Sequence, residues 1–229
     1  MCRRDIKRLV EPALSKGRTW GSLPLCMIES LNAEFWNNRY ESGQTPWDFG
    51  GVPAALQEFL KRHPKGGRVL IPGCGSGYEV EAFARAGYDV IAIDLSPVAV
   101  SRARQRVGPA LGGRIFEGDF FKANLDPASF DVVYERSFLC ALRPELRESY
   151  RDRMARVLKP GGALVGFFYY QKTDPEDGPP FGLAWGESDQ LLARHFLLVK
   201  DVPCTDSLPA FAGRERWQEN RRTAYPVKE

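Results

Sequence analysis

Cysteine pairs, histidines and long apolar runs are scarce in this sequence. Its five cysteines are widely spaced and include no C-x-x-C pair, so we expect neither a disulfide framework nor a metal site, and a reducing cytoplasm is the simpler environment. His63 and His195 are the only histidines, and neither belongs to a recognisable acid–base dyad. The longest apolar run, residues 163–170, is shorter than the about 18 residues of a membrane-spanning helix, so we expect no membrane partner.

Charge of one sign is also in short supply. The formal net charge is +3, whereas a nucleic-acid-binding protein usually has a concentrated basic face, so we expect no nucleic-acid partner. Residues 1–30 hold six Lys or Arg against three Asp or Glu, which accounts for the whole excess and leaves the rest formally neutral. We expect residues 1–30 to be a basic N-terminal tail, either disordered or lying ahead of a true start at Met27. The tail lacks the apolar core of a secretory signal.

Hydrophobic residues make up 43% of the chain and aromatic residues 12%, which is enough for a sizeable core. We expect strands over 68–71, 89–93, 114–117, 131–134, 163–170, 196–202 and 214–222. We expect helices over 30–40, 52–62, 79–85, 98–107, 144–158 and 188–194, the fifth of them ended by the glycines of 159–162. Strands that alternate with helices predict one Rossmann-like α/β domain over 31–229, with a mostly parallel seven-stranded sheet and helices on both faces.

A glycine-rich turn is the first candidate binding feature. Gly73-Cys74-Gly75-Ser76-Gly77 comes directly after an expected strand and before an expected helix. Glycine lets the backbone approach a ligand closely, and the helix N-terminus offers free N–H groups. Taken alone, the same turn also fits a simple tight connection, so it predicts a ligand only together with other features.

Two acids follow the next two strands. Asp94 ends the second strand, where a carboxylate can accept hydrogen bonds from both ribose hydroxyls of an adenosine; the alternative is a helix cap, but Ser96 already fills that role. Asp119 closes the third strand, where it can accept from the adenine amino group while Phe120 packs on the ring; the alternative is an ordinary turn. Since adjacent parallel strands end at one edge of a sheet, these features predict a shared adenosine pocket.

NAD and S-adenosylmethionine are the two cofactors that such a pocket suggests. The dinucleotide fingerprint G-x-G-x-x-G is not met, because Tyr78 stands where the third glycine belongs. The shorter glycine turn, the Asp119-Phe120 pair and the Leu158–Gly162 turn resemble S-adenosylmethionine-dependent methyltransferases instead. A nucleic-acid methyltransferase is disfavoured, since Tyr134-Glu-Arg-Ser replaces the expected Asn/Asp-Pro-Pro-Tyr element. An NAD-binding oxidoreductase and a non-catalytic S-adenosylmethionine-binding module stay open as alternatives.

A more specific resemblance rests on several short stretches taken together. They are Phe35-Trp36, Thr45-Pro46-Trp47-Asp48, Ile71-Pro72-Gly73-Cys74-Gly75, Glu135-Arg136, Phe138-Leu139-Cys140-Ala141-Leu142 and Gly178-Pro179-Pro180-Phe181. This combination resembles the thiopurine S-methyltransferase family, which includes thiol, thiocyanate and halide methyltransferases, over roughly residues 34–222. The resemblance implies a class I methyltransferase fold and S-adenosylmethionine as cofactor.

The resemblance also implies which residues bind that cofactor. Most enzymes of the class carry an acid two residues before the first glycine, but Ile71 stands there, and an N-terminal cover over 31–66 is the implied compensation. Its aromatic faces would stabilise the sulfonium by cation–π attraction, with Tyr40 standing where relatives often have Trp. The expected cofactor-binding residues are Trp36, Tyr40, Trp47, Gly73, Gly75, Asp94, Asp119, Phe120 and Arg136.

The acceptor motifs are mixed between branches of the family. Arg136 matches the thiopurine branch, whereas Cys140 resembles the halide and thiol branch; their alternatives are a surface salt bridge and a buried inert thiol. Arg136, Arg143 and Arg147 are candidates to steer an anionic acceptor, and the loop 178–181 is expected to wall the acceptor pocket.

The implied reaction is in-line methyl transfer to a small soft nucleophile, which is a thiol, thiopurine, thiocyanate or halide. Because such acceptors need no general base, the protein mainly positions the reactants, and no catalytic residue is assigned. We expect a cytoplasmic monomer that acts on a small molecule.

Overall fold

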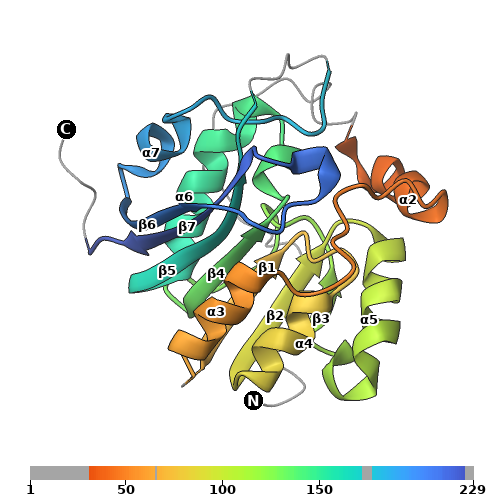
Figure 1. The fold of residues 1–229 in the computed structure, drawn as a ribbon. Coiled ribbons are helices and arrows are strands. Elements are labelled where there is room, and N and C mark those ends of the chain that lie inside the picture. The colour runs from red at the N-terminus through yellow and green to blue at the C-terminus, as the bar shows by residue number, and fades with distance from the viewer. Residues whose placement is uncertain (1–30, 65, 172–176, 225–229) are drawn as a thin grey trace, which may run out of the picture.

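The computed structural model describes residues 31–64, 66–171 and 177–224 (Figure 1). The expected basic tail, residues 1–30, lies outside the described residues. A seven-stranded sheet runs through the molecule in the order β3-β2-β1-β4-β5-β7-β6. Its strands are β1 (Gly67–Pro72), β2 (Tyr88–Asp94), β3 (Ile115–Glu117), β4 (Phe130–Arg136), β5 (Leu158–Tyr169), β6 (Phe196–Pro203) and β7 (Glu215–Arg222). Strands β1 to β5 pair in parallel, and β7 lies antiparallel between β5 and β6.

Helices cover both faces of the sheet (Figure 1). They are α2 (Ala33–Glu41), α3 (Ala54–Arg62), α4 (Tyr78–Arg85), α5 (Pro97–Gly112), α6 (Arg147–Val157) and α7 (Glu187–Leu192). Side chains alternate across a strand, so Leu70 packs into the core under α6 and α7, whereas Val69 and Ile71 pack under α3, α4 and α5. The predicted α/β class, with a mostly parallel seven-stranded sheet and helices on both faces, is confirmed.

The helix starts follow from local capping. The Ser96 hydroxyl accepts a hydrogen bond from the Ala99 amide at 3.1 Å, and Pro97 begins α5, as the Ser-Pro pair predicts. Asn32 caps α2 by accepting from the Phe35 amide at 3.0 Å, so this helix begins a turn later than residue 30. Helix α5 runs beyond the expected residue 107 to Gly112, with a break at Gly108.

The segment after α6 differs from the expectation. Residues 159–162 do not form a helix stop, because Leu158 already pairs with Phe130 as the first residue of β5. The glycines instead form an irregularity inside the strand, where the register shifts before Ala163. A Cβ at Gly162 would lie 2.9 Å from the Lys159 carbonyl oxygen, so the close backbone approach requires glycine there. The start also differs, since the 3₁₀ turn Pro144–Leu146 precedes α6.

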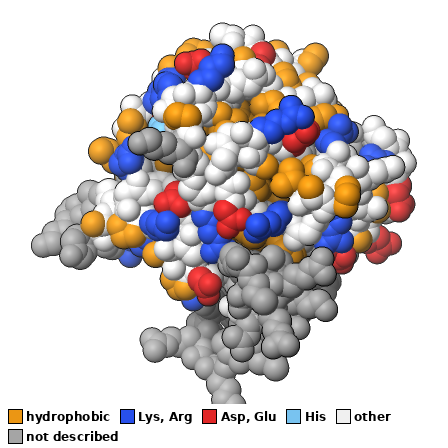
Figure 2. Space-filling view, turned by 90° about the horizontal axis from the view of Figure 1, so that it is seen from below, with side chains coloured by type: hydrophobic (Ala, Val, Ile, Leu, Met, Phe, Trp, Pro, Cys, Tyr) orange, Lys and Arg blue, Asp and Glu red, His pale blue; other side chains and the backbone are white. Residues whose placement is uncertain are grey.

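The surface has no strong bias of charge on the face seen in Figure 2, where Lys and Arg side chains are interspersed with Asp and Glu over its described part. This mixing agrees with the near-zero formal charge of residues 31–229. Among the described residues, no helix is both long and apolar enough to cross a membrane.

Candidate active site

One large cavity lies at the carboxyl ends of the parallel strands. Its volume is about 680 Å³, and it is lined by the loops that follow β1 to β5, by α2 and its loop, and by the segment before β7. All nine predicted cofactor-binding residues line it: Trp36, Tyr40, Trp47, Gly73, Gly75, Asp94, Asp119, Phe120 and Arg136. The two acids thus face one cavity, as the adenosine pocket requires.

The glycine turn brings backbone to the cavity surface. Gly73 and Gly75 have φ values of 62° and 51°, in the left-handed region that side chains disfavour. A Cβ at Gly73 would lie 2.7 Å from the Phe138 ring, and one at Gly75 would lie 3.0 Å from the Tyr40 hydroxyl. Side chains here would therefore occupy space next to the cavity, and glycine leaves the backbone open to a ligand.

Asp94 joins the glycine turn to the start of α5. It is 8% exposed. One carboxylate oxygen accepts from the Gly75 amide at 2.9 Å, and the other accepts from the Ser96 amide at 2.9 Å. Burial raises the pKa of Asp94, and these backbone hydrogen bonds oppose the rise. An ionised carboxylate offers about four acceptor sites, so Asp94 keeps capacity for a ligand hydroxyl beside its backbone donors.

Asp119 and its neighbours form the far end of the cavity. One Asp119 oxygen accepts from the Phe121 amide at 2.8 Å, and the other lies 3.3 Å from the Lys122 ammonium. Phe120 is 3% exposed and belongs to the core, so most of its ring already packs on protein. Phe121 is less buried and also lines the cavity, which gives a flat ligand two neighbouring rings at this end.

Three aromatic rings from the N-terminal segment meet over the glycine turn. The Trp47 ring packs edge-to-face on Trp36 at 5.6 Å and on Tyr40 at 6.0 Å, measured between ring centroids. Edge-to-face pairs of this kind are favourable contacts. Tyr40 is buried, while Trp36 and Trp47 keep part of their surface exposed. All three line the cavity, and their role as a cover for the cofactor stays a prediction.

Hydrogen bonds hold this cover to the rest of the molecule. The Ser76 hydroxyl donates to the Asp48 carboxylate at 2.5 Å, which links the loop after α2 to the glycine turn. The Ser96 hydroxyl donates to the Asn37 side chain at 2.6 Å, and the Arg102 guanidinium donates to the Tyr40 carbonyl at 2.5 Å. The cover therefore rests on the same turn and helix that Asp94 connects.

Arg136 places a buried cation beside the cavity. Its side chain is 9% exposed, so it is not a surface salt bridge. The guanidinium lies 4.1 Å from the Phe167 ring centroid and 5.3 Å from that of Phe49. Glu215 is 3.8 Å away, beyond hydrogen-bonding distance. None of its nitrogens has a hydrogen-bond partner within the described part of the chain, and a buried donor without a partner favours an anionic ligand.

Glu135 lies behind the cavity wall rather than on it. It is 1% exposed. One oxygen accepts from the Phe138 and Leu139 amides at 2.8 and 3.0 Å, and the other accepts from the Tyr150 hydroxyl at 2.8 Å. Burial raises the pKa of Glu135 to about 7, although these hydrogen bonds oppose the rise. The carboxylate fixes the turn that carries Cys140.

Cys140 belongs to an aromatic pocket at the β5 side of the cavity. It is 8% exposed and packs with Tyr169, Phe211 and Trp47. Burial, and next the nearby Glu135 carboxylate, raise the pKa of the Cys140 thiol far above its ordinary value. The thiol therefore stays protonated at neutral pH, which fits the expectation of an inert thiol rather than a nucleophile.

The loop 178–181 and the two remaining arginines have different surroundings. Pro179 and Pro180 line the cavity, as does Arg143, and the Phe181 amide donates to the Cys140 carbonyl at 2.7 Å. Arg147 is instead a structural anchor, because its guanidinium donates to the Gly182 carbonyl at 2.9 Å and also contacts Glu187. It is therefore not the anion-steering residue that the sequence suggested.

Several other cavity residues were not predicted: Asp48, Phe49, Ser76, Glu79, Tyr169, Phe211 and Arg214. Asp48 follows Trp47 within the motif 45–48, so that motif contained a usable signal. Nothing local marks Tyr169, Phe211 or Arg214, because the sheet order is what brings the end of β5 beside the start of β7.

Comparison with known proteins gives a consistent result. A family model described as thiopurine S-methyltransferase matches residues 31–223. A probable thiol methyltransferase 2 from Arabidopsis thaliana is 32% identical, over 69% of this chain and 70% of the relative. A thiocyanate methyltransferase 1 from Brassica oleracea is 31% identical over 72% and 74%, and a thiopurine S-methyltransferase from Vibrio campbellii is 31% identical over 76% and 87%.

The fold recurs in solved structures of lower identity. A 1,6-didemethyltoxoflavin-N1-methyltransferase from Burkholderia thailandensis, bound to S-adenosylhomocysteine, superposes with a TM-score of 0.68 at 20% identity, over 93% of this chain and 96% of that one. This likeness shows the fold, whereas the family model and the sequence relatives show kinship. The chain belongs to the thiopurine S-methyltransferase family and is an enzyme that uses S-adenosylmethionine to methylate a small nucleophile.

Proposed function

We propose that this enzyme methylates either a sulfur atom, in a thiol, thiopurine or thiocyanate, or a halide ion. The acceptor is held as an anion beside Arg136. The supporting observation is the Arg136 guanidinium, which is buried at the cavity wall without a hydrogen-bond partner among the described residues. The surrounding wall is largely aromatic, with Phe49, Tyr169 and Phe211. The nearest paired carboxylate, Glu215, lies 3.8 Å from the guanidinium and forms no hydrogen bond with it, so the donors of Arg136 are free to bind a soft, weakly hydrated anion.

Two parts of the cavity have different proposed tasks. The cofactor half consists of the cover residues Trp36, Tyr40 and Trp47 together with 73–77, Asp94 and 118–121. The acceptor half consists of 136–143, Tyr169, 179–180 and 210–214. The residues of the cofactor half fit S-adenosylmethionine because bare glycine backbone, two carboxylates and an aromatic cover adjoin one space.

Each residue of the cofactor half has a proposed role. Gly73 and Gly75 present backbone to the ligand, Asp94 accepts from the ribose hydroxyls, and Asp119 accepts from the adenine amino group while Phe120 supports the ring. The cover over residues 31–66 excludes water and offers aromatic faces to positive charge. When bound, the cofactor supplies a methyl group already activated on a sulfonium.

The acceptor half positions the nucleophile and performs no proton transfer. With S-adenosylmethionine in the cofactor half, the residues of the acceptor half would hold the nucleophilic atom of the acceptor in line with the sulfonium–methyl bond, so that the methyl group would pass to the acceptor and the electron pair of that bond to the cofactor sulfur. Arg136 holds the anion before attack. Cys140 remains a protonated wall residue, which agrees with its raised pKa. Positioning and exclusion of water are the means by which such a site accelerates the reaction.

The proposed setting is a monomer in the cytoplasm that acts on a small molecule and not on nucleic acid. Cys74, Cys140 and Cys204 are free thiols, which supports a reducing compartment. The interspersed surface charge in Figure 2 offers no concentrated basic face there, which supports a small-molecule acceptor.

The test is transfer of a labelled methyl group to a panel of thiols, thiopurines, thiocyanate and iodide, with volatile products measured by headspace mass spectrometry. We expect turnover with at least one sulfur or halide anion. Binding of S-adenosylmethionine without transfer to any acceptor would favour a non-catalytic binding module. Calorimetric binding of NAD in place of S-adenosylmethionine would favour the oxidoreductase alternative.

A further inference from the structure

The amino-acid end of S-adenosylmethionine carries an ammonium group, and the end of β1 offers no carboxylate to it. The residue two positions before Gly73 is Ile71, which is 3% exposed and packs in the core. Burying an ammonium group without a counter-charge is costly. Another acid of the cavity must therefore pair with this ammonium group for the enzyme to bind the cofactor tightly.

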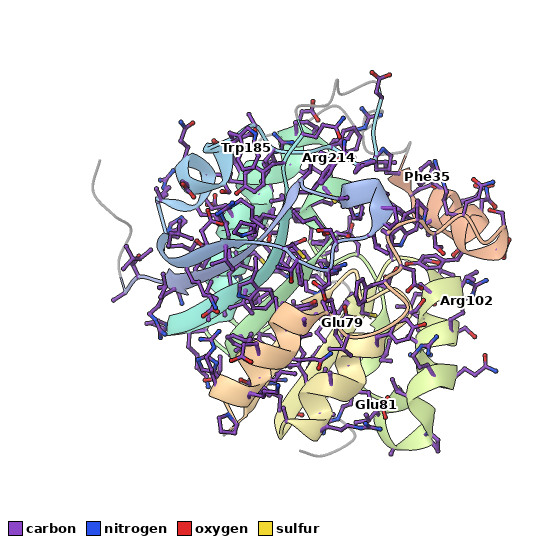
Figure 3. The ribbon with its side chains drawn as sticks, viewed as in Figure 1. Phe35, Glu79, Glu81, Arg102, Trp185 and Arg214 are labelled. Atoms are coloured by element: carbon purple, nitrogen blue, oxygen red, sulfur yellow. The ribbon has the colours of Figure 1, made fainter. Side chains whose placement is uncertain are left out.

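Glu79 is well placed to do so. It belongs to the first turn of α4, two residues after Gly77, and it lines the cavity. In Figure 3 it lies at the inner end of α4, toward the centre of the molecule, while Glu81 lies at the outer side. Its side chain is partly buried, and a carboxylate in the first turn of a helix is favoured by the helix dipole.

The hydrogen bonding of Glu79 is weak for a carboxylate in such a place. The Tyr134 hydroxyl donates to it at 3.4 Å, which is a long contact, and Glu79 makes no salt bridge with another described residue. Burial raises its pKa, and the negative charge of Asp48 adds to the rise, while the positive charge of Arg136 and hydrogen bonds from its own amide and from Tyr134 oppose it. A cation bound next to Glu79 would relieve this penalty.

The other acids near the glycine turn are already engaged. Asp48 accepts from the Ser76 hydroxyl at 2.5 Å and from the Gly50 amide at 2.9 Å. Asp94 accepts from two backbone amides. Glu79 differs from both, because its side-chain donor, Tyr134, lies 3.4 Å away, whereas the donors to Asp48 and Asp94 lie within 2.9 Å.

We propose that Glu79 is the counter-charge for the α-ammonium group of the cofactor and takes over the task of the acid absent at position 71. The inference rests on the proposed placement of the cofactor against residues 73–77. Glu79 acts only on the amino-acid end of the ligand, so the adenosine contacts of Asp94 and Asp119 do not depend on it.

Calorimetry with two ligands separates this role from a structural one. S-adenosylhomocysteine carries the ammonium group, whereas 5′-methylthioadenosine lacks the whole amino-acid end. We expect Glu79→Gln to weaken S-adenosylhomocysteine binding by about 10- to 100-fold, the range for losing a charge-assisted contact, and to leave 5′-methylthioadenosine binding unchanged. Equal losses for both ligands, or no loss for either, would overturn the proposal.

Glu81→Gln is the matched control. Glu81 lies on the same helix, has a half-exposed side chain that pairs with Arg85 at 2.6 Å, and does not line the cavity, so its substitution changes the same charge away from the site. We expect both ligands to bind it as they bind the unaltered enzyme. A loss of S-adenosylhomocysteine affinity here equal to that of Glu79→Gln would show a general charge effect and overturn the local role.

A comparison of two ligands on the unaltered enzyme avoids any effect of a substitution on folding. We expect it to bind the deaminated analogue of S-adenosylhomocysteine at least tenfold more weakly than S-adenosylhomocysteine itself, and Glu79→Gln to reduce that difference. Equal affinity of the unaltered enzyme for both would overturn the proposal. If the unaltered enzyme binds neither S-adenosylhomocysteine nor 5′-methylthioadenosine, the cofactor placement fails as well, and this result is distinct from a failure of Glu79 alone.

Discussion

The cofactor half and the acceptor half of the cavity each depend on one buried carboxylate, but the two carboxylates work in different positions. Asp94 accepts from the amides of Gly75 and Ser96 and also lines the cavity. Glu135 accepts from the amides of Phe138 and Leu139 but lies behind the wall. Asp94 therefore shapes its half and also lines the cavity, whereas Glu135 only shapes its half.

This difference bears on how each half can change. The cofactor half combines the connections that follow β1, β2 and β3 with the aromatic cover, and backbone amides of these connections donate to its two carboxylates. The acceptor half draws side chains from the ends of β4 and β5 and from the segment before β7. Where backbone groups bind a ligand, amino-acid substitutions change the binding site little. Where side chains bind it, each substitution can change the shape of the site.

Asp94→Ala tests the cofactor half most severely. The substitution removes two ligand acceptors and leaves the Gly75 and Ser96 amides without their partner, a loss of about 3 kcal/mol or more. We expect S-adenosylmethionine affinity in calorimetry to fall by at least about 100-fold while the circular dichroism spectrum is retained. Unchanged affinity would remove Asp94 from the ribose site.

Glu135→Gln tests the acceptor half through stability. A carboxyl group whose pKa is about 7 in the folded protein binds its proton more tightly there than in the unfolded chain. Its contribution to stability is therefore present below about pH 4.5 and is lost as the pH rises to about 7, up to about 3 kcal/mol in total. Urea denaturation at pH 5 and pH 8 should show this loss in the unaltered enzyme and not in the variant. Parallel pH profiles would contradict the assignment.

Arg136→Met tests whether the cation serves the acceptor. We expect kcat/KM for an anionic acceptor to fall by about 30-fold, corresponding to about 2 kcal/mol, while the Kd for S-adenosylhomocysteine changes by less than about threefold. The sequence grouped Arg136 with the cofactor-binding residues. A large loss of S-adenosylhomocysteine affinity with an unchanged acceptor KM would return it to that half.

Trp47→Leu tests the aromatic cover and has the smallest expected effect. Cation–π attraction of about 1 kcal/mol acts on the positively charged S-adenosylmethionine and not on neutral S-adenosylhomocysteine. We expect the affinity ratio of these two ligands to shift about fivefold toward S-adenosylhomocysteine. Trp185→Leu is the control, since Trp185 is 69% exposed and stacks on Tyr170 outside the cavity. An equal shift in the control would exclude a specific effect of the cover.

The sequence predicted the fold and most of the cofactor half because their signals are local. The glycine turn, Asp94 and Asp119 follow directly after apolar strands, so strand order alone brings them to one edge. The roles of these residues stay predictions until the ligand measurements are made. Glu79 carried no signal, because an acid in the first turn of a helix is common on stability grounds alone.

The acceptor half was less predictable for a physical reason. Tyr169, Phe211 and Arg214 meet only because β7 inserts between β5 and β6, which is a long-range pairing. Arg147 looked like a free cation in the sequence, yet carbonyl groups near residue 182 engage it. The role of the glycines after α6 was predicted wrongly, because a strand irregularity and a helix stop favour the same residue type.

The reversed direction of β7 has a consequence for how this enzyme can diversify. The parallel strands run toward the cavity, but β7 runs away from it, so the connection that precedes β7 contributes Ala210, Phe211 and Arg214 to the cavity wall. Insertions or deletions in that connection would be absorbed at the mouth of the pocket without disturbing the parallel pairing. We therefore expect that exchanging residues 204–214 between related enzymes changes the preferred acceptor and leaves the cofactor half unchanged.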